Sequence, residues 1–355
     1  MFIAAVRGTL PDHYYDQDAL IAGFLQHWSE AHHNADRLVR LHQAVAVSGR
    51  HLALPMEKYP SLTFGEANDT FISVGTQIGA QAIREALSAV DLKPEDVDVI
   101  FTTTVTGIAT PSLDARLINI LGFRPDIKRV PLFGLGCVAG AAGTARLSDY
   151  LKGHPDQVGV LLSVELCSLT IQRGDFSVAN LIASGLFGDG AAALVGIGTN
   201  RAQKMGLVGP RVVASQSRFY PNTERVMGWD IGDTGFQVVL DASVPDVVKT
   251  HIRPDADAFL AQQGLSLSDI QTWIAHPGGP KVLTAFEESL DLPSGALSVT
   301  WDSLHEVGNL SSASVLFVLR DTLAQRSTDA SGLGLMMAMG PGFCSEFVLM
   351  KWDST

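Results

Sequence analysis

Charge is scarce in this sequence, and positive charge is the scarcer kind. Charged residues make up 17% of the 355 residues, below the roughly 25% usual for globular proteins. Lys and Arg number 25 against 37 Asp and Glu, which gives a formal net charge of −12. Because nucleic acids are bound through clustered Lys and Arg, we expect no nucleic-acid partner, although a small anionic ligand needs only a local basic patch. A low surface charge also favours a surface partly covered by a second subunit.

Cysteine is equally sparse, and long apolar runs are missing. The three cysteines, Cys137, Cys167 and Cys344, show no CxxC spacing, which argues against a disulfide framework and against a zinc site. No apolar run approaches the roughly 20 residues of a membrane span, and Met1–Leu10 lacks the basic and long apolar regions of a signal peptide. With 46% hydrophobic residues, we expect a globular, cytoplasmic protein with a large core and no metal.

Strand and helix signals alternate along the chain. Short β-branched or apolar runs between Gly and Pro are typical of buried strands, and longer amphipathic runs are typical of helices. The expected strands cover residues 97–104, 157–164, 190–197, 270–275 and 332–339, and the expected helices cover 19–47, 113–121, 138–150 and 281–290. The first sixty residues look mainly helical and polar. The alternation predicts an α/β fold whose sheets are covered by helices.

The second half of the chain repeats the order of these signals. The strand at 270–275, the loop HPGGP and the helix at 281–290 correspond to the strand at 97–104, the turn from Gly107 to Pro111 and the helix behind it. We therefore predict an internal duplication with a junction within residues 204–211. The two halves are 1–203, which carries Cys137, and 204–355.

Cys137 lies in the small-residue run FGLGCVAGAAG, directly before an expected helix. The positive end of a helix dipole and its unpaired N–H groups stabilise a thiolate. Neighbouring Gly residues let a ligand approach the backbone and leave N–H groups free for an oxyanion. Cys137 is therefore a candidate nucleophile, although a small buried residue in a packing helix is the alternative. We interpret Cys167 and Cys344 as structural.

Two polar residues have similar settings in the second half. His276 ends an expected strand and begins the HPGGP loop, and Asn309 lies in GNLSSAS before a helix expected near Ser311. Asn309 is alternatively a helix cap. His305 is a second candidate histidine, but its expected helix favours a solvent-exposed face. Because ligands of α/β folds bind at the carboxyl ends of strands, Cys137, His276 and Asn309 together predict an acyl-transfer site.

Several motifs occur in order, and together they are specific. They are GCVAGAAG around Cys137, LFGDGAAA from Leu186, HPGGP from His276, GNLSSAS from Gly308 and GPGFCSE from Gly340. From about Gly49 onward the chain resembles the type III polyketide synthases of the chalcone and stilbene synthase superfamily, and most of all mycobacterial-type members associated with long-chain alkylpyrones. The resemblance implies a thiolase-like fold, with a duplicated five-layer αβαβα architecture and two mixed sheets, and a homodimer.

The resemblance also implies the chemistry. Cys137 would take an acyl group from an acyl-CoA starter, and His276 and Asn309 would hold the thioester oxygen of the extender, malonyl-CoA or methylmalonyl-CoA, as it loses CO2. An imidazolium at His276 would also stabilise the Cys137 thiolate. The substrates would be CoA thioesters without a bound cofactor. The product would be an alkylpyrone or alkylresorcinol built on a long-chain fatty acyl starter.

Further positions match residues that surround the active site in members of the family. Phe187 matches a gatekeeping phenylalanine between the CoA tunnel and the cavity, although core packing would also explain it. Matches to cavity-lining positions are Thr106, Thr170 and Ser311. Residues expected to bind the CoA phosphates are Arg37 and Arg40, with Arg50 nearby, while Ala44 stands where a third basic residue is common.

Departures from the plant members concern the size of the cavity. Val238 stands in place of a second gatekeeping phenylalanine, with Phe236 and Trp229 close to it, and Thr110 replaces a methionine that reaches across the dimer interface. Smaller side chains at these positions would open the cavity for a long acyl chain. Two other functions remain: a single condensation of the kind catalysed by an initiating ketoacyl synthase III, and a non-catalytic acyl-binding paralogue.

Overall fold

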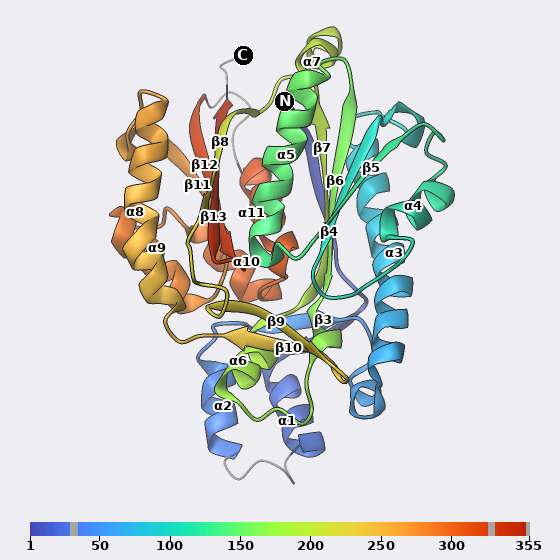
Figure 1. Cartoon of the computed structure of the whole chain (residues 1–355), viewed down its shortest axis with the longest axis vertical. Helices are drawn as coiled ribbons and strands as arrows, with labels where there is room; N and C mark the ends of the chain where they lie inside the picture. The colour runs from blue at the N-terminus through green and yellow to red at the C-terminus, as the bar shows by residue number, and fades with distance from the viewer. Residues whose placement is uncertain (29–34, 326–330, 353–355) are drawn as a thin grey trace.

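The computed structural model describes residues 1–28, 35–325 and 331–352, which form alternating layers of helices and strands (Figure 1). One outer layer contains α3 (Phe64–Ser88) and α4 (Leu113–Leu121), and the other contains α8 (Val244–Gln262) and α9 (Pro280–Leu290). Between the two strand layers lie α5 (Ala139–Gly153) and α11 (Ser314–Gln325). This is the predicted five-layer thiolase-like architecture.

The strands of both layers join into one mixed sheet. Its order is β11-β12-β13-β8-β1-β7-β6-β4-β5. The strands are β1 (Phe2–Thr9), β4 (Val99–Thr104), β5 (Lys128–Phe133), β6 (Val158–Leu166), β7 (Asp189–Ile197), β8 (Arg211–Phe219), β11 (Ile270–Ala275), β12 (Gly332–Gly340) and β13 (Cys344–Trp352). The two predicted sheets meet only at the pair of Phe2 with Arg211, where β1 lies beside β8.

Strand directions repeat on the two sides of this junction. In the first half β4 and β6 are parallel, and β6–β7 and β7–β1 are antiparallel. In the second half β11 and β12 are parallel, and β12–β13 and β13–β8 are antiparallel. Both halves thus show the same order of directions over four strands toward the junction, and the first half adds β5 in parallel outside β4. The division that we propose after residue 203 falls in α7 (Thr199–Lys204).

The N-terminal region differs from its predicted form. The helix expected at 19–47 is two helices, α1 (Gln17–Trp28) and α2 (Ala35–Gln43), and residues 29–34 of that range lie outside the described part. The segment before them is not helical but forms β1 and β2 (His13–Asp16), and β3 (Gly49–Leu52), which follows the two helices, pairs with β2. The reason is tertiary: β1 is held between β7 and β8, which lie about 190 and 210 residues away in the chain.

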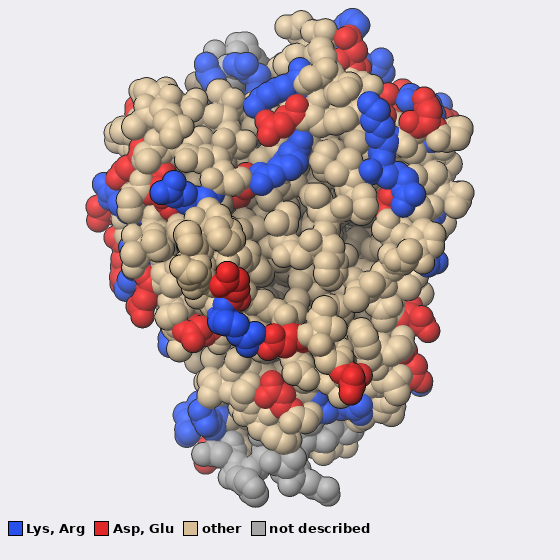
Figure 2. All heavy atoms as spheres, viewed as in Figure 1, with Lys and Arg blue, Asp and Glu red and all other residues tan. Residues whose placement is uncertain are grey.

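A smaller group of elements lies beside the ends of the strands (Figure 1). It contains α1, α2, α6 (Val178–Leu186) and the hairpin of β9 (Met227–Gly232) and β10 (Gly235–Leu240). The face in Figure 2 is hollowed in its middle, and most of its charged side chains lie toward the rim. Within the described residues, no helix combines the length and apolar character needed to cross a membrane.

Candidate active site

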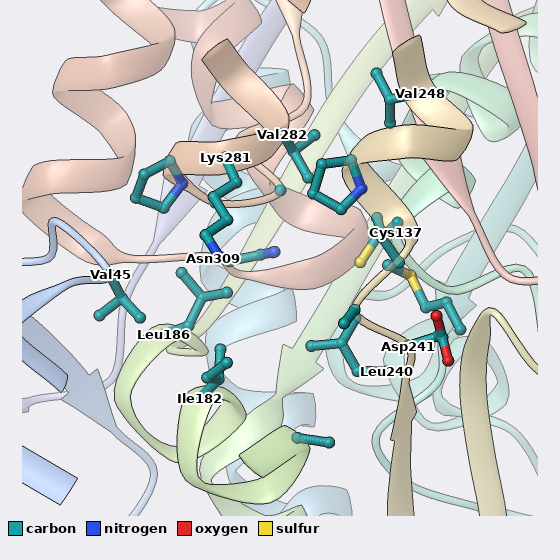
Figure 3. Close-up of a pocket in the computed structure, with 18 of the residues that line it drawn as sticks. Val45, Cys137, Ile182, Leu186, Leu240, Asp241, Val248, Lys281, Val282 and Asn309 are labelled. Carbon is teal, nitrogen blue, oxygen red and sulfur yellow. The ribbon is translucent and has the colours of Figure 1, made fainter. Parts of the chain in front are cut away.

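The structure brings Cys137, His276 and Asn309 to one cavity of about 410 Å³. Cys137 lies in a short 3-10 turn, Gly136–Val138, directly before α5. His276 follows the last residue of β11, and Asn309 follows α10 (Ser298–Val307). Figure 3 shows Cys137 and Asn309 at this pocket, together with apolar side chains that include Ile182 and Leu186 of α6 and Val248 of α8. The predicted grouping of the three residues is therefore present in the fold.

Asn309 is held by its backbone and by its side chain. Its N–H donates to the carbonyl oxygen of Leu186 at 2.9 Å, and its carbonyl oxygen accepts from the N–H of Gly188 at 3.0 Å. Its Oδ1 accepts from the N–H of Ser311 at 2.8 Å. This last bond fixes the orientation of the amide, so that the amino group faces the Cys137 thiol. A buried amide donor of this kind suits an oxyanion.

His276 is 3% exposed, and neither ring nitrogen has a hydrogen-bond partner among the described residues. Burial lowers the pKa of His276 to about 3, so the ring is neutral near pH 7. Unsatisfied buried polar atoms are rare in native proteins and point to a bound group. The imidazole is therefore ready to donate one hydrogen bond and to accept another from a substrate.

The thiol of Cys137 is neutral in the same surroundings. Burial raises its pKa to about 12; the nearby carboxyl group of Glu165 adds to this, while Ser311 and Asn309 act in the opposite direction. The Cys137 Sγ lies 3.7 Å from the Ser311 Oγ. Burial by itself disfavours both charged forms, so the pair of imidazolium and thiolate that the resemblance implies stays a prediction. The thiol proton must move to a base as the sulfur attacks.

Phe187 stands between this cavity and a smaller space of about 30 Å³, and both are lined by Cys137 and Phe187. Trp229, Val238 and Ser311 line the smaller space. The sequence therefore predicted the position of Phe187 between two compartments. Val238 lies opposite Trp229 in the pairing of β9 with β10, and the expected enlargement through Val238 stays a prediction.

Other predicted cavity residues lie behind the surface of the site. Thr106 is buried and donates to Glu165 at 2.8 Å, and Thr170 donates to the carbonyl oxygen of Cys167 at 2.8 Å. Phe236 is buried against Phe64 and Trp229. None of the three lines either of the two compartments. Their side chains are buried beside the two compartments, and their contact with substrate stays a prediction.

Thr110 and His305 lie elsewhere. Thr110 is exposed in the segment between β4 and α4 and lines neither compartment of its own chain. A role at a subunit interface stays a prediction for this residue. His305 is exposed on α10, and its Nε2 lies 2.5 Å from the Ser48 Oγ, so it is not the histidine of the site.

The mouth of the larger cavity is marked by residues that line it and are exposed. They include Ala44, Asp241 and Lys281. Arg37 and Arg40 are exposed on α2, on the helix face that leads to Ala44, because residues three and four apart are neighbours on a helix. Lys281 was not predicted from the sequence. It is the second residue of α9, directly after the HPGGP loop, and Figure 3 shows it among the residues around the pocket.

Among the basic residues predicted to bind CoA, Arg50 does not lie where that role requires. It is 2% exposed, and its Nη1 donates to the carbonyl oxygen of Phe187 at 2.7 Å. A guanidinium enclosed in this way cannot reach CoA phosphates at the mouth, so its predicted role is wrong. Nothing in the sequence indicated this burial, because Arg is mostly found at the surface and its packing on a short strand is not visible in the sequence.

A buried carboxyl group next to the site was also missed. Glu165 on β6 accepts from the backbone N–H of Val105 at 3.1 Å and from Thr106, and its other oxygen accepts from Ser312. Burial raises the pKa of Glu165 to about 7, although these hydrogen bonds oppose the shift. The only sign in the sequence was a lone acidic residue within a run of apolar strand residues, VGVLLSVEL.

Comparisons with known proteins agree with this fold and site. A model of the C-terminal domain of chalcone and stilbene synthases matches residues 211–352, and a model of FAE1/type III polyketide synthase-like proteins matches residues 61–207. The crystal structure of 1,3,6,8-tetrahydroxynaphthalene synthase from Streptomyces coelicolor A3(2), a bacterial type III polyketide synthase, superimposes with a TM-score of 0.93 at 29% identity, covering 100% of both chains.

Individual relatives are also similar to this chain in sequence. It is 52% identical over 99% of its length to a 1,3,6,8-tetrahydroxynaphthalene synthase of Streptomyces peucetius subsp. caesius, of which it covers 93%. It is 28% identical over 88% of its length to an alpha-pyrone synthesis polyketide synthase-like protein of Mycobacterium tuberculosis, of which it covers 82%. The chain belongs to the type III polyketide synthase family. It is an acyltransferase of the class that condenses malonyl-CoA.

Proposed function

We propose that Cys137 carries the growing acyl chain while His276 and Asn309 stabilise the enolate formed from malonyl-CoA. One observation carries this proposal: the three side chains share one cavity, and both nitrogens of His276 are buried without a partner among the described residues. The neutral imidazole and the fixed amide of Asn309 are donors aimed at the same space. No metal or cofactor is required for these steps.

The reaction has two parts. The thiol of Cys137 attacks the starter thioester, its proton passes to the neutral His276, and CoA leaves as the thiol after it takes up that proton. The C–C bond to the carboxylate of malonyl-CoA then breaks, CO2 leaves, and the electron pair passes onto the thioester oxygen. The enolate carbon attacks the acyl-Cys137 carbonyl, and the Cys137 thiolate is released. Transfer of the longer chain back to Cys137 starts the next cycle.

We propose a malonyl-derived starter and a hydroxylated naphthalene as product. The relative that is 52% identical over 99% of the chain is a tetrahydroxynaphthalene synthase, and malonyl units alone can supply every carbon of a naphthalene skeleton. The space beyond Phe187, at about 30 Å³, also favours a small starter.

A long-chain acyl starter with an alkylpyrone product is the second candidate, as the sequence suggested. One observation favours it: the walls of the larger cavity are almost wholly apolar. Side chains of α6 and α8 that form this wall are Val178, Ala179, Ile182, Val244, Pro245 and Val248. An alkyl chain would bury apolar surface there.

Product analysis separates the two candidates. Purified protein receives malonyl-CoA alone, and in parallel malonyl-CoA with a series of acyl-CoA starters, under anaerobic conditions that protect electron-rich polyphenols. We expect mass spectrometry to find a tetrahydroxynaphthalene with malonyl-CoA alone. Alkylpyrones formed only with long-chain starters would support the second candidate instead. A single ketoacyl thioester on a carrier protein would indicate a ketoacyl synthase III.

The roles of the site residues have their own test. Malonyl-CoA decarboxylation, measured as CO2 release, should fall at least about a hundredfold in His276→Ala and in Asn309→Ala, the loss usual when an oxyanion donor is removed. Cys137→Ala should abolish product formation. Decarboxylation that survives replacement of both His276 and Asn309 would contradict the mechanism. A wild-type protein with no activity would indicate the acyl-binding paralogue.

A further inference from the structure

Two short backbone segments that carry site residues lie side by side. Leu186–Gly188 carries the gatekeeper Phe187, and Gly308–Asn309 carries the amide of the oxyanion site. Phe187 and Asn309 form an isolated parallel β-bridge, with hydrogen bonds of 2.9 Å and 3.0 Å between the segments. The bridge is a single pair rather than a strand, so its own hydrogen bonds give it little rigidity.

The side chain of Arg50 packs behind this bridge. A Cβ on Gly308 would lie 3.3 Å from both Cγ and Cδ of Arg50, and one on Gly188 would lie 3.6 Å from the Cβ of Arg50. The guanidinium donates to the Phe187 carbonyl oxygen at 2.7 Å. Arg50 therefore touches both segments and bonds to one of them. Both glycines are needed, because a side chain at either would also press on the opposite backbone at 2.6 Å.

We propose that Arg50 is a positioning residue that locks the Phe187–Asn309 bridge, and so holds the gatekeeper and the oxyanion amide in one fixed relation. It does not touch the substrate space itself, since it lines neither compartment. Its effect on the reaction runs through the backbone of Phe187 and Asn309. This assigns to Arg50 a role in the chemical step rather than in binding CoA.

The cost of burying this cation supports the assignment. A buried ionised side chain is expensive unless it is paired, and the Arg50 Nε has no partner among the described residues. Burial lowers the pKa of Arg50 to about 10, opposed chiefly by the charge of Asp189, so the guanidinium stays protonated near neutral pH. The Asp189 carboxylate is fixed by the N–H groups of Ala53 and Ser168, at 2.7 Å and 2.8 Å. The cation is thus held by a rigid counter-charge.

The inference rests on the proposed roles of Asn309 and Phe187, and the experiment tests these separately. Arg50→Met removes the charge and the donor, and Arg50→Lys keeps the charge on a shorter side chain. We expect kcat for malonyl-CoA decarboxylation to fall by about tenfold or more in Arg50→Met and by less in Arg50→Lys, with KM within about twofold. Alkylation of Cys137 by iodoacetamide, followed on its own peptide by mass spectrometry, should change by less than about twofold.

A double-mutant cycle shows whether Arg50 acts through Asn309. Replacing Arg50 by Lys should lower kcat much less in an Asn309→Ala background than in wild type, because coupled residues are not additive. Arg146→Lys is the control: Arg146 on α5 pairs with the buried carboxylate of Glu346 and lines neither compartment, so its replacement should leave kcat unchanged.

Three results would overturn the inference. They are an unchanged kcat in folded Arg50→Met or Arg50→Lys, equal losses with and without Asn309, and a raised KM at constant kcat, which would return Arg50 to CoA binding. If Arg50→Met does not fold, Arg50→Lys carries the test. A wild-type protein whose decarboxylation does not depend on Asn309 would instead overturn the proposed function, and the inference with it.

Discussion

Burial affects the pKa values of Cys137 and His276 more than neighbouring charges do. Cys137 and His276 are both held neutral, since burial moves the pKa of the thiol to about 12 and that of the imidazole to about 3. A neutral thiol loses its proton to a base as the sulfur attacks the thioester. Among the described residues that line the larger cavity, the charged ones are Asp241 and Lys281, and both lie at its mouth.

Lys281 is predicted to bind a phosphate of CoA, in place of the basic residue that Ala44 lacks. Lys281→Ala should raise KM for malonyl-CoA by about 2- to 5-fold, the effect of losing an exposed ion pair worth about 0.5–1 kcal/mol, with kcat unchanged. Steady-state kinetics check this, with malonyl-N-acetylcysteamine as a substrate that has no phosphates and Lys152→Ala as a control. Equal losses with both substrates would contradict phosphate binding.

Glu165 should make stability depend on pH. Its pKa is raised from 4.5 to about 7, so the stability it contributes is fully present below pH 4.5 and is lost as the pH rises through about 7. The loss amounts to about 3 kcal/mol, since one pKa unit equals about 1.4 kcal/mol. Urea unfolding at pH 5 and pH 8 should show a drop in wild type that is smaller in Glu165→Gln. Parallel pH profiles of the two proteins would rule this out.

At the scale of elements, close packing of α5 sets the position of the site. A Cβ on Gly140 would lie 2.3 Å from the carbonyl oxygen of Ser312 and 2.6 Å from Cγ1 of Val315. The start of α5, which follows Cys137, therefore packs closely against the turn that follows Asn309. The small residues that the sequence shows after Cys137 thus bring the two segments together across 170 residues of chain.

Gly140→Ala tests this contact. We expect a loss of about 1–3 kcal/mol in the free energy of unfolding, because the Ser312 backbone cannot move away from the added methyl group without disturbing the site. Gly153→Ala is the control on the same helix, where an added Cβ meets nothing within 4 Å. It should be neutral or stabilising by up to about 1 kcal/mol. Urea denaturation measures both, and equal effects would refute the packing argument.

At the scale of the whole molecule, the sheet ends in an open edge. β5 is the last strand in the sheet order, and most of its side chains are exposed, including Phe133 at 55%. Ile120 on α4, a helix that contacts β5, is also an exposed large apolar residue, and so is Ile108 in the segment between β4 and α4. An uncovered edge strand with apolar neighbours favours association with another chain. A second copy at this edge would also place Thr110, which lies between β4 and α4, near the interface.

We predict a homodimer that uses this edge. Sedimentation velocity should give twice the mass of one chain for wild type, and Phe133→Glu should shift the protein toward the monomer, because a buried carboxylate without a partner is costly. Val208→Glu is the control, at an exposed apolar residue away from β5. The same sedimentation coefficient for Phe133→Glu and wild type would exclude β5 from the interface.

The sequence by itself determined the class of the protein and the identity of its three central residues. Periodicity located the elements that are buried on both faces, and α4 and β11 match their predicted ranges residue for residue. These patterns are local, because a strand or helix boundary depends on neighbouring residues and on Gly or Pro beside them. The order of the motifs around Cys137, His276 and Asn309 then indicated the family, which the comparisons establish.

Only the tertiary structure decided which side chains face the substrate. Arg50, Thr106 and Phe236 were predicted at the site and lie behind it, whereas Lys281 and Glu165 were not predicted and lie at its mouth and beside its nucleophile. Exposure and pKa depend on atoms contributed by segments far apart in the chain, and no local pattern records them. The uncommon neutral state of Cys137 and His276 has the same origin, because burial is a property of the packed molecule and not of either residue.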